Sequence, residues 1–199
     1  GVMKRVHRGA DGPPDDASSK QGVTAADFDN DGDIDIYVCR REEGNWLFVN
    51  DGSGHFIEKA DEYDVDVGGR SHGAAFADVD NDGDLDLFVI NYAYTPGDLP
   101  LMSVFINNGD GSFLNATKSY NIPISGYSVS FGDVDNDGDL DMLLPYNNEK
   151  DPGAVPRLLV NNGAGIFYRA SCGVEVPTKD PRGVAYGDID NDGDIDFYI

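Results

Sequence analysis

Four nearly identical segments rich in aspartate recur along the sequence, and their spacing limits the folds that the chain can adopt. They begin at Asp27, Asp78, Asp133 and Asp188, at intervals of 51, 55 and 55 residues, and read DFDNDGDID, DVDNDGDLD, DVDNDGDLD and DIDNDGDID. Small residues precede each segment, as in GAAFA before Asp78, and an apolar run follows it, as in LFVI after Asp86. A repeat of this length indicates one supersecondary unit stacked several times.

The negative charge of the chain is concentrated in these segments. The 199 residues include 37 acidic and 14 basic side chains, a formal net charge of -23, and 20 of the acids lie in the four segments. A surface this acidic is not expected to bind nucleic acid, because the phosphate backbone repels it. No apolar run reaches the ~20 residues of a membrane-spanning helix, so direct membrane insertion is not expected either.

Each repeat has the pattern of four short strands. Strand A is the small-residue segment, strand B the apolar run, and strands C and D flank an Asn-Gly type turn in WLFVNDGSGHF, VFINNGDGSF and LLVNNGAGIF. Continuous apolar character in strand B indicates burial on both faces, which requires a neighbouring sheet on each side. The predicted fold is therefore all-β, a β-propeller of four-stranded blades. A linear solenoid is the alternative.

The repeat boundaries predict a single propeller segment over residues 1–199. Residues 1–20 would supply an outer strand of a preceding blade and a loop. Residues 21–71, 72–126 and 127–181 would form three complete blades, and residues 182–199 the first two strands of a further blade. At about 55 residues per blade, seven blades need roughly 385 residues. We therefore expect a partial ring, an excerpt of a seven-bladed propeller.

The nine-residue acidic segments, called aspartate loops here and numbered from position 1, have the composition of a calcium site. Alternate carboxylates in a tight loop converge on one point, and glycine at position 6 permits the turn. The carboxylates at positions 1, 3, 5 and 9 and the carbonyl oxygen of position 7 would make an all-oxygen site, which suits Ca²⁺ rather than zinc or copper. About four structural Ca²⁺ ions are expected. The candidate metal residues are Asp27, Asp29, Asp31, Asp33, Asp35, Asp78, Asp80, Asp82, Asp84, Asp86, Asp133, Asp135, Asp137, Asp139, Asp141, Asp188, Asp190, Asp192, Asp194 and Asp196.

The EF-hand is the obvious alternative, and it fails at position 12. An EF-hand needs glutamate there and a helix on each side of the loop. The four residues at this position are apolar and belong to predicted strands: Val38, Val89, Leu144 and Ile199. The hydrophobic residue at position 8, such as Ile34, is expected to anchor the loop to the core in either scheme.

With these motifs identified, the chain resembles the FG-GAP/VCBS repeat family, whose calcium loops follow DxDxDGxxD between strands A and B. Integrin α-subunit propellers carry the same loop. The fuller pattern, including LFxNxGxGxF, is most similar to the secreted cartilage-acidic-protein group. The resemblance covers residues 21–199. It implies an extracellular, calcium-stabilised propeller used in adhesion or matrix binding.

Binding is expected on the face opposite the aspartate loops, where the connections vary in length. The residues six positions before each loop are Gln21, His72, Tyr127 and Arg182, and these are the candidate ligand surface. No catalytic Ser/His/Asp or Cys/His arrangement is evident, so no enzyme is predicted. The predicted function is a protein-binding, adhesion or matrix scaffold module. A glycan-binding lectin is the alternative, and a polysaccharide-active enzyme comes third.

Three further features bear on the location of the protein. Calcium is abundant outside cells, which favours a secreted or cell-surface protein. Asn115 begins the sequon Asn-Ala-Thr and is a candidate glycosylation site. Two cysteines, Cys39 and Cys172, are too few for a disulfide framework and are interpreted as separate thiols or as partners of groups outside this chain.

Overall fold

The computed structural model describes residues 20–68, 70–92, 102–122, 126–145, 157–170 and 182–198. These ranges form three four-stranded antiparallel sheets, one strand pair and a four-residue helix, α1 (Thr117–Tyr120). The first two sheets contain β1 (Lys20–Ala26), β2 (Asp35–Arg40), β3 (Trp46–Asn50) and β4 (Phe56–Glu58), then β5 (Ser71–Ala77), β6 (Asp86–Asn91), β7 (Ser103–Asn107) and β8 (Phe113–Asn115). The third sheet and the pair contain β9 (Ser130–Gly132), β10 (Asp141–Leu144), β11 (Arg157–Val160) and β12 (Tyr168–Ala170), then β13 (Ala185–Gly187) and β14 (Asp196–Tyr198).

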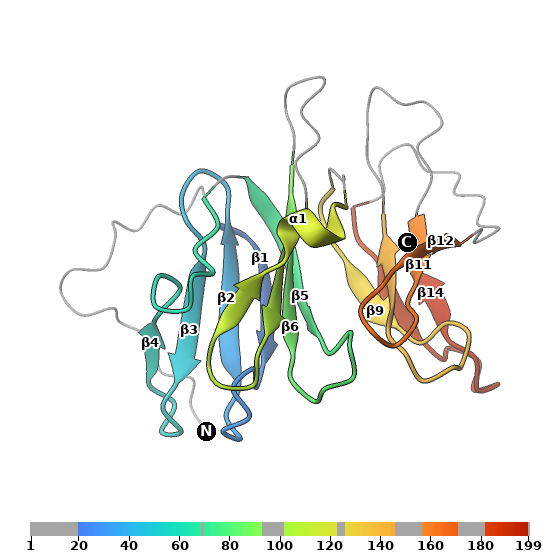
Figure 1. Cartoon of the computed structure of the whole chain (residues 1–199), viewed down its shortest axis with the longest axis horizontal. Helices are drawn as coiled ribbons and strands as arrows, with labels where there is room; N and C mark the ends of the chain where they lie inside the picture. Colours follow the sequence, from blue (N-terminus) through green and yellow to red (C-terminus); the bar gives the residue numbers. More distant parts are fainter. Residues whose placement is uncertain are drawn as a thin grey trace.

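Each sheet is one sequence repeat folded as a propeller blade. Its strands pair with their neighbours in chain order, from strand A inside to strand D outside. The sheets follow one another from the blue β1–β4 sheet to the red β13–β14 pair, and the innermost strands β1, β5, β9 and β13 contact one another in that order (Figure 1). The all-β fold, a partial ring of four-stranded blades, is confirmed.

The innermost strands approach so closely that glycine is required between them. A Cβ atom on Gly22 would overlap the carbonyl oxygen of His72, and one on Gly73 would overlap the carbonyl oxygen of Tyr127. The small residues that the sequence places in strand A therefore let two backbones meet at the centre of the ring. This spacing repeats from the first blade to the second and from the second to the third.

Strand β6 shows why an apolar run occupies strand B. Leu87 and Val89 point into the core cluster shared with the first blade, which contains Phe28, Tyr37 and Phe105. Phe88 and Ile90, on the other face of the strand, point into the cluster shared with the third blade, which contains Met102, Val104, Met142 and Leu144. All four β6 side chains are fully buried. The hydrophobic core therefore lies between blades, and a blade is covered on both faces only when it has two neighbours.

The first blade differs from this arrangement on one face. Val23 of β1 is 68% exposed, whereas Val129, at the same position in the third repeat, is 7% exposed. Ile34 at loop position 8 is 53% exposed, although the sequence predicts that it anchors its loop to the core. That prediction is wrong for Ile34, because no blade in the described ranges covers this side of the first sheet. Leu140, at the same loop position, packs against the core.

Of the two cysteines, only Cys39 lies in the described residues. Cys39 is a free thiol in β2, and burial raises its pKa to about 12, so it is neutral at pH 7 and acts as a small hydrophobic residue. Cys172, and the outer strand predicted within residues 1–20, lie outside the described residues apart from Lys20, which begins β1. In the ranges that are described, no helix has the length and apolar character needed to cross a bilayer.

Candidate metal centres

Each aspartate loop connects strands A and B of one blade. Position 1 directly follows the small-residue strand, and position 9 is the first residue of strand B, as in Asp35 at the start of β2 and Asp86 at the start of β6. Because the two strands are antiparallel neighbours, the chain must reverse direction within the eight residues between them. The residues at both ends are consequently fixed by the sheet.

Hydrogen bonds from the backbone give the loop its shape. In the first loop the Asp27 carboxylate accepts the N–H groups of Asp31, at 3.1 Å, and Gly32, at 3.0 Å. Asn30 and Gly32 adopt positive φ angles of 58° and 94°, which asparagine and glycine tolerate best. The same bonds and the same two positive angles recur in the other three loops. The four loops therefore share one conformation.

The aspartate at position 9 ties the loop to the rest of the blade. Asp86 accepts the N–H groups of Asn107 at the end of β7, at 2.9 Å, and of Val79 at loop position 2, at 3.2 Å. Asp141 makes the equivalent bonds to Asn161 and Val134, at 2.8 and 2.9 Å. Both carboxylates are buried. Hydrogen bonds from the protein alone therefore hold the position 9 carboxylate in place.

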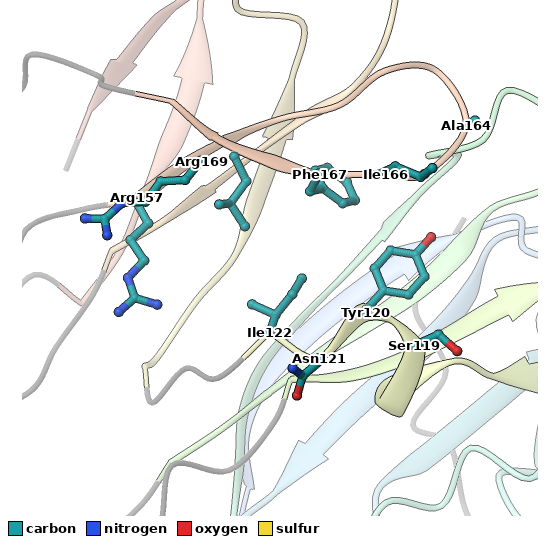
Figure 2. A pocket seen from close by; sticks show the side chains of 11 residues that line it. Ser119, Tyr120, Asn121, Ile122, Arg157, Ala164, Ile166, Phe167 and Arg169 are labelled. Carbon is teal, nitrogen blue, oxygen red and sulfur yellow. The ribbon is translucent and has the colours of Figure 1, made fainter.

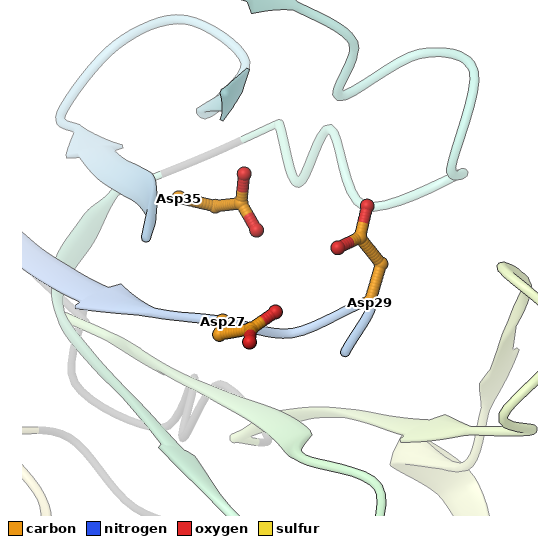
Figure 3. Close-up of side chains that lie close together, drawn as sticks. All are labelled: Asp27, Asp29 and Asp35. Carbon is orange, nitrogen blue, oxygen red and sulfur yellow. The ribbon is translucent and has the colours of Figure 1, made fainter. Parts of the chain in front are cut away.

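Three carboxylates gather in each loop. In the first, Asp27, Asp29 and Asp35 face a common space, as Figure 3 shows. In each group one oxygen from every residue lies within 4.8 Å of the others. The groups are Asp27, Asp29 and Asp35; Asp78, Asp80 and Asp82; Asp133, Asp135 and Asp141; and Asp188, Asp190 and Asp196. Positions 1 and 3 contribute in every loop, and position 9 or position 5 completes the group.

The oxygen atoms of these groups fit a bound cation. Asp29 Oδ1, Asp35 Oδ2 and Asp80 Oδ1 are buried and accept no hydrogen bond within the described residues. A buried carboxylate oxygen without a partner is costly, and a hard cation such as Ca²⁺ would satisfy it. Residues at loop positions 1, 3, 5 and 9 would hold the ion through carboxylate oxygens.

The pKa values of the carboxyl groups reflect the same crowding. Burial raises the pKa of Asp35 to about 6 and that of Asp86 to about 7, although backbone N–H groups partly oppose the shift. Burial and the neighbouring carboxylate at position 5 raise the pKa values of Asp29 and Asp80. Without a cation, Asp35 of the first loop and Asp86 of the second are therefore partly protonated near neutral pH.

The side chains at position 7 lie outside these groups of three. Asp84 Oδ1 accepts a hydrogen bond from Asn30 of the preceding loop, at 2.7 Å, and Asp139 and Asp194 accept the equivalent bonds from Asn81 and Asn136. The sequence analysis assigned position 7 to the metal through its carbonyl oxygen, so its side chain is available for this bond. It attached no role to the asparagine at position 4. The available signal was the identity of position 4, which is asparagine in all four loops.

The candidate ligand residues lie at the other end of the inner strands, and three of them meet. The His72 and Tyr127 ring centroids are 5.1 Å apart, Tyr92 lies 5.3 Å from His72 and 5.2 Å from Tyr127, and the Arg182 guanidinium lies 5.1 Å from the Tyr127 ring. These four residues are called the inner-strand cluster here. Burial lowers the pKa of His72, and the positive charges of Arg41 and Arg182 lower it further. Gln21, at the equivalent position of the first blade, is exposed.

The predicted glycosylation site is accessible. Asn115 is the exposed last residue of β8, and its side-chain oxygen accepts the N–H of Thr117, at 3.2 Å. Thr117 begins α1, a turn that the sequence analysis did not predict. Its hydroxyl accepts the N–H of Val104, at 3.1 Å, and so fastens the turn to β7. Glycosylation of Asn115 stays a prediction.

Comparison with known proteins agrees with this architecture. The chain is 29% identical over 186 residues to cartilage acidic protein 1 of Xenopus tropicalis, an alignment that covers 90% of this chain and 28% of that protein. The chain thus spans less than a third of the length of this relative. The FG-GAP-like repeat matches residues 27–89 and 91–144, more than half of the chain. Those matched ranges include three of the four aspartate loops, and the chain belongs to the FG-GAP-like repeat family.

Proposed function

We propose that this chain is a calcium-stabilised, extracellular β-propeller module that binds a protein partner in adhesion or in a matrix. The observation that carries the proposal is the set of four carboxylate groups, each closing one A–B turn and each with oxygens within 4.8 Å of one another. An all-oxygen cluster of this kind takes hard cations, and Ca²⁺ accepts the six to eight ligands that such loops offer. Millimolar calcium outside cells would fill even weak sites.

The calcium has a structural role in this proposal. All carboxylates of a site come from one short loop, and position 9 is already bonded to strand C of the same blade. A bound cation removes the repulsion between these carboxylates and so favours the closed turn. The proposed ions hold the A–B turn of each blade closed and take part in no chemical reaction.

The partner would bind at the end opposite the aspartate loops. Aromatic rings and cations lie together there: the inner-strand cluster near the centre, and Trp46 of β3 with the Arg40 guanidinium 4.2 Å from its ring centroid. Tyrosine, tryptophan and arginine are the residues that most often dominate protein interfaces. Arg40 is buried and pairs with Glu43, whereas Arg41 and Arg182 both lie near His72. Their positive charge favours an acidic surface on the partner.

Counting bound ions tests the calcium sites directly. Native mass spectrometry of the chain, stripped with chelator and returned to calcium, should detect about four Ca²⁺ per chain. The variant Asp80→Asn should lose one ion, and Arg182→Ala, at the other end, should keep all of them. A chain that binds no calcium, or an Asp80→Asn variant with unchanged stoichiometry, would contradict the proposal.

A glycan is the second candidate ligand, favoured by a cavity of about 500 Å³ between the second and third blades. Tyr120 and Phe167 form its aromatic wall beside Asn121, and Arg157 and Arg169 lie together at one end (Figure 2). Aromatic rings with polar neighbours suit the stacking of a sugar. An array of glycans and acidic peptides distinguishes the two candidates. Loss of glycan binding in Phe167→Ala favours the cavity, and loss of peptide binding in Arg182→Ala favours the inner-strand cluster.

A further inference from the structure

Hydrogen bonds connect each aspartate loop to the next one. The Nδ2 atom of Asn30 donates to Asp84, at 2.7 Å, across the first interface between blades. Asn81 donates to Asp139, at 2.7 Å, across the second, and Asn136 to Asp194, at 2.9 Å, across the third. In every case the donor is at position 4 of one loop and the acceptor is at position 7 of the following loop. The three interfaces therefore share one connection.

A second connection runs parallel to the first and is buried. Asn107, the last residue of β7, donates from Nδ2 to the carbonyl oxygen of Phe28 in the preceding loop, at 2.8 Å, and to that of Leu85 in its own loop, at 3.2 Å. Asn161 does the same with Val79, at 2.7 Å, and Leu140, at 3.2 Å. One amide thus joins position 2 of one loop to position 8 of the next, which gives adjacent loops a second contact.

The residues of the first connection are next to the metal residues in the chain. Asn81 lies between Asp80 and Asp82, which both belong to the carboxylate group of the second loop. Asp139, its acceptor, donates its own N–H to Asp137 of the third loop, at 3.0 Å. A continuous path therefore leads from the carboxylates of one loop, through an asparagine and an aspartate, to a carboxylate of the next.

We propose that the aspartate loops are coupled in series, with the asparagine at position 4 and the aspartate at position 7 acting as positioning residues between neighbouring calcium sites. Binding of calcium to one loop orders its asparagine, which then holds the next loop in its closed conformation. Because coupling between two sites is reciprocal, each site raises the affinity of the other. Asp84, Asp139 and Asp194 contribute their side chains to this connection and not to a cation. The inference rests on the proposed calcium sites.

The chain provides a matched pair of variants for the test. Asn81→Gly removes a connecting amide, while glycine keeps the backbone φ of 60° without strain. Asn191→Gly makes the same substitution at the same φ of 60° in the fourth loop, where no acceptor for Asn191 is present in the described ranges. Any effect of the substitution within a loop is common to both variants. A difference between them therefore reports the connection.

Calorimetric titration of the chelator-stripped 199-residue chain with calcium measures the coupling. The unmodified chain should bind with a Hill coefficient above 1, and Asn81→Gly should weaken binding to the second and third loops about fivefold, at the lower end of typical coupling. Asn191→Gly should bind like the unmodified chain. Hydrogen exchange of residues 133–141 at half-saturating calcium should be faster in Asn81→Gly alone, and the effect of Asn81→Gly should vanish in an Asp139→Ala background.

Two results would overturn the inference, and they are distinguishable. If calcium binds to about four independent sites and Asn81→Gly equals Asn191→Gly in affinity and in exchange, the coupling is absent while the proposed function stands. If no calcium binds at all, the proposed function fails and the coupling fails with it.

Discussion

The two ends of the propeller differ in how much their residues vary from one repeat to the next. At one end, four loops of nearly identical sequence adopt one conformation, with the same backbone bonds to position 1 and the same two positive φ angles. At the other end, the four equivalent positions before the loops are occupied by glutamine, histidine, tyrosine and arginine. The same strands of each blade connect the two ends. Uniformity at the first end is what the proposed cation sites require, and diversity at the second is what a proposed selective binding surface allows.

The comparison separates stability from recognition. Carboxylates at the loop end have raised pKa values and buried oxygens without partners in the described residues, and the proposed cation would relieve both. At the opposite end, Asn45 donates to Tyr37 and Ser71, both at 2.9 Å, and no group of three carboxylates gathers in the part of this end that the structure describes. His72 Nε2 and Ser128 Oγ are buried there without a hydrogen-bond partner among the described residues, but neither atom carries a negative charge. We therefore expect calcium to control the folding free energy of the chain, and side chains of the inner-strand cluster to control binding.

Removal of calcium should have the largest effect. Replacing 2 mM calcium by excess chelator should lower the melting temperature by roughly 10 °C, because four cations that bind only the folded chain are lost. Circular dichroism follows the melt, and magnesium in place of calcium is the control, since Mg²⁺ prefers a smaller octahedral site. An unchanged melting temperature in chelator would contradict the expectation that the aspartate loops control the stability of the chain through calcium.

Disruption of a backbone contact near the opposite end should give the second-largest loss of melting temperature. Gly73→Ala should lower the melting temperature by roughly 5 °C, because the new Cβ overlaps the Tyr127 carbonyl oxygen and forces two inner strands apart. Gly183→Ala is the matched control, since a Cβ at this equivalent position meets no atom within 4 Å in the described structure. Equal melting temperatures for the two variants would show that the inner strands are not in contact there.

The response to pH should change sign with calcium. In chelator, the raised pKa values of Asp35 and Asp86 mean that the folded chain binds more protons than the unfolded chain between about pH 4 and 7. Acidification from pH 8 to pH 5 should then raise the melting temperature by a few degrees. In saturating calcium the same acidification should lower it, because protons compete with the ion for the carboxylates.

A substitution of His72 provides the control for the pH experiment. The lowered pKa of His72 works in the opposite direction, because the folded chain favours its neutral form and acidification destabilises it. His72→Gln should therefore enlarge the stabilisation by acid in chelator. A melting temperature that falls with acid in chelator, even in this variant, would contradict the assignment of the effect to the loops.

Substitution in the inner-strand cluster should have the smallest effect on stability. Arg182→Ala removes a cation–π contact with Tyr127 and should shift the melting temperature by less than about 3 °C. Its calcium stoichiometry, measured by native mass spectrometry, should stay at that of the unmodified chain. A large loss of stability or of calcium in this variant would mean that the two ends are not separable.

The repeat made most of the fold predictable. Four-stranded blades, the loop between strands A and B, and burial of both faces of β6 all follow from a pattern that recurs in the sequence. The exposure of Ile34 did not follow, because it depends on which blades have neighbours and not on the residue itself. The roles of Asn30 and Asp84 also did not follow, because a bond between residues 54 positions apart cannot be inferred from either loop alone.

The contact between inner strands also explains how the ligand surface can vary. Gly22 and Gly73 fix the distance between neighbouring backbones. The strand register shifts beside them, between Lys20 and Val23 in β1 and between Ser71 and Gly73 in β5. A β-bulge at this point re-aims the side chain without moving the strand. The exposed Gln21 can therefore be exchanged for other residues without repacking the centre of the ring, whereas exchange of His72 would also change its contacts with Tyr92 and Tyr127. New specificities can evolve on this scaffold one side chain at a time.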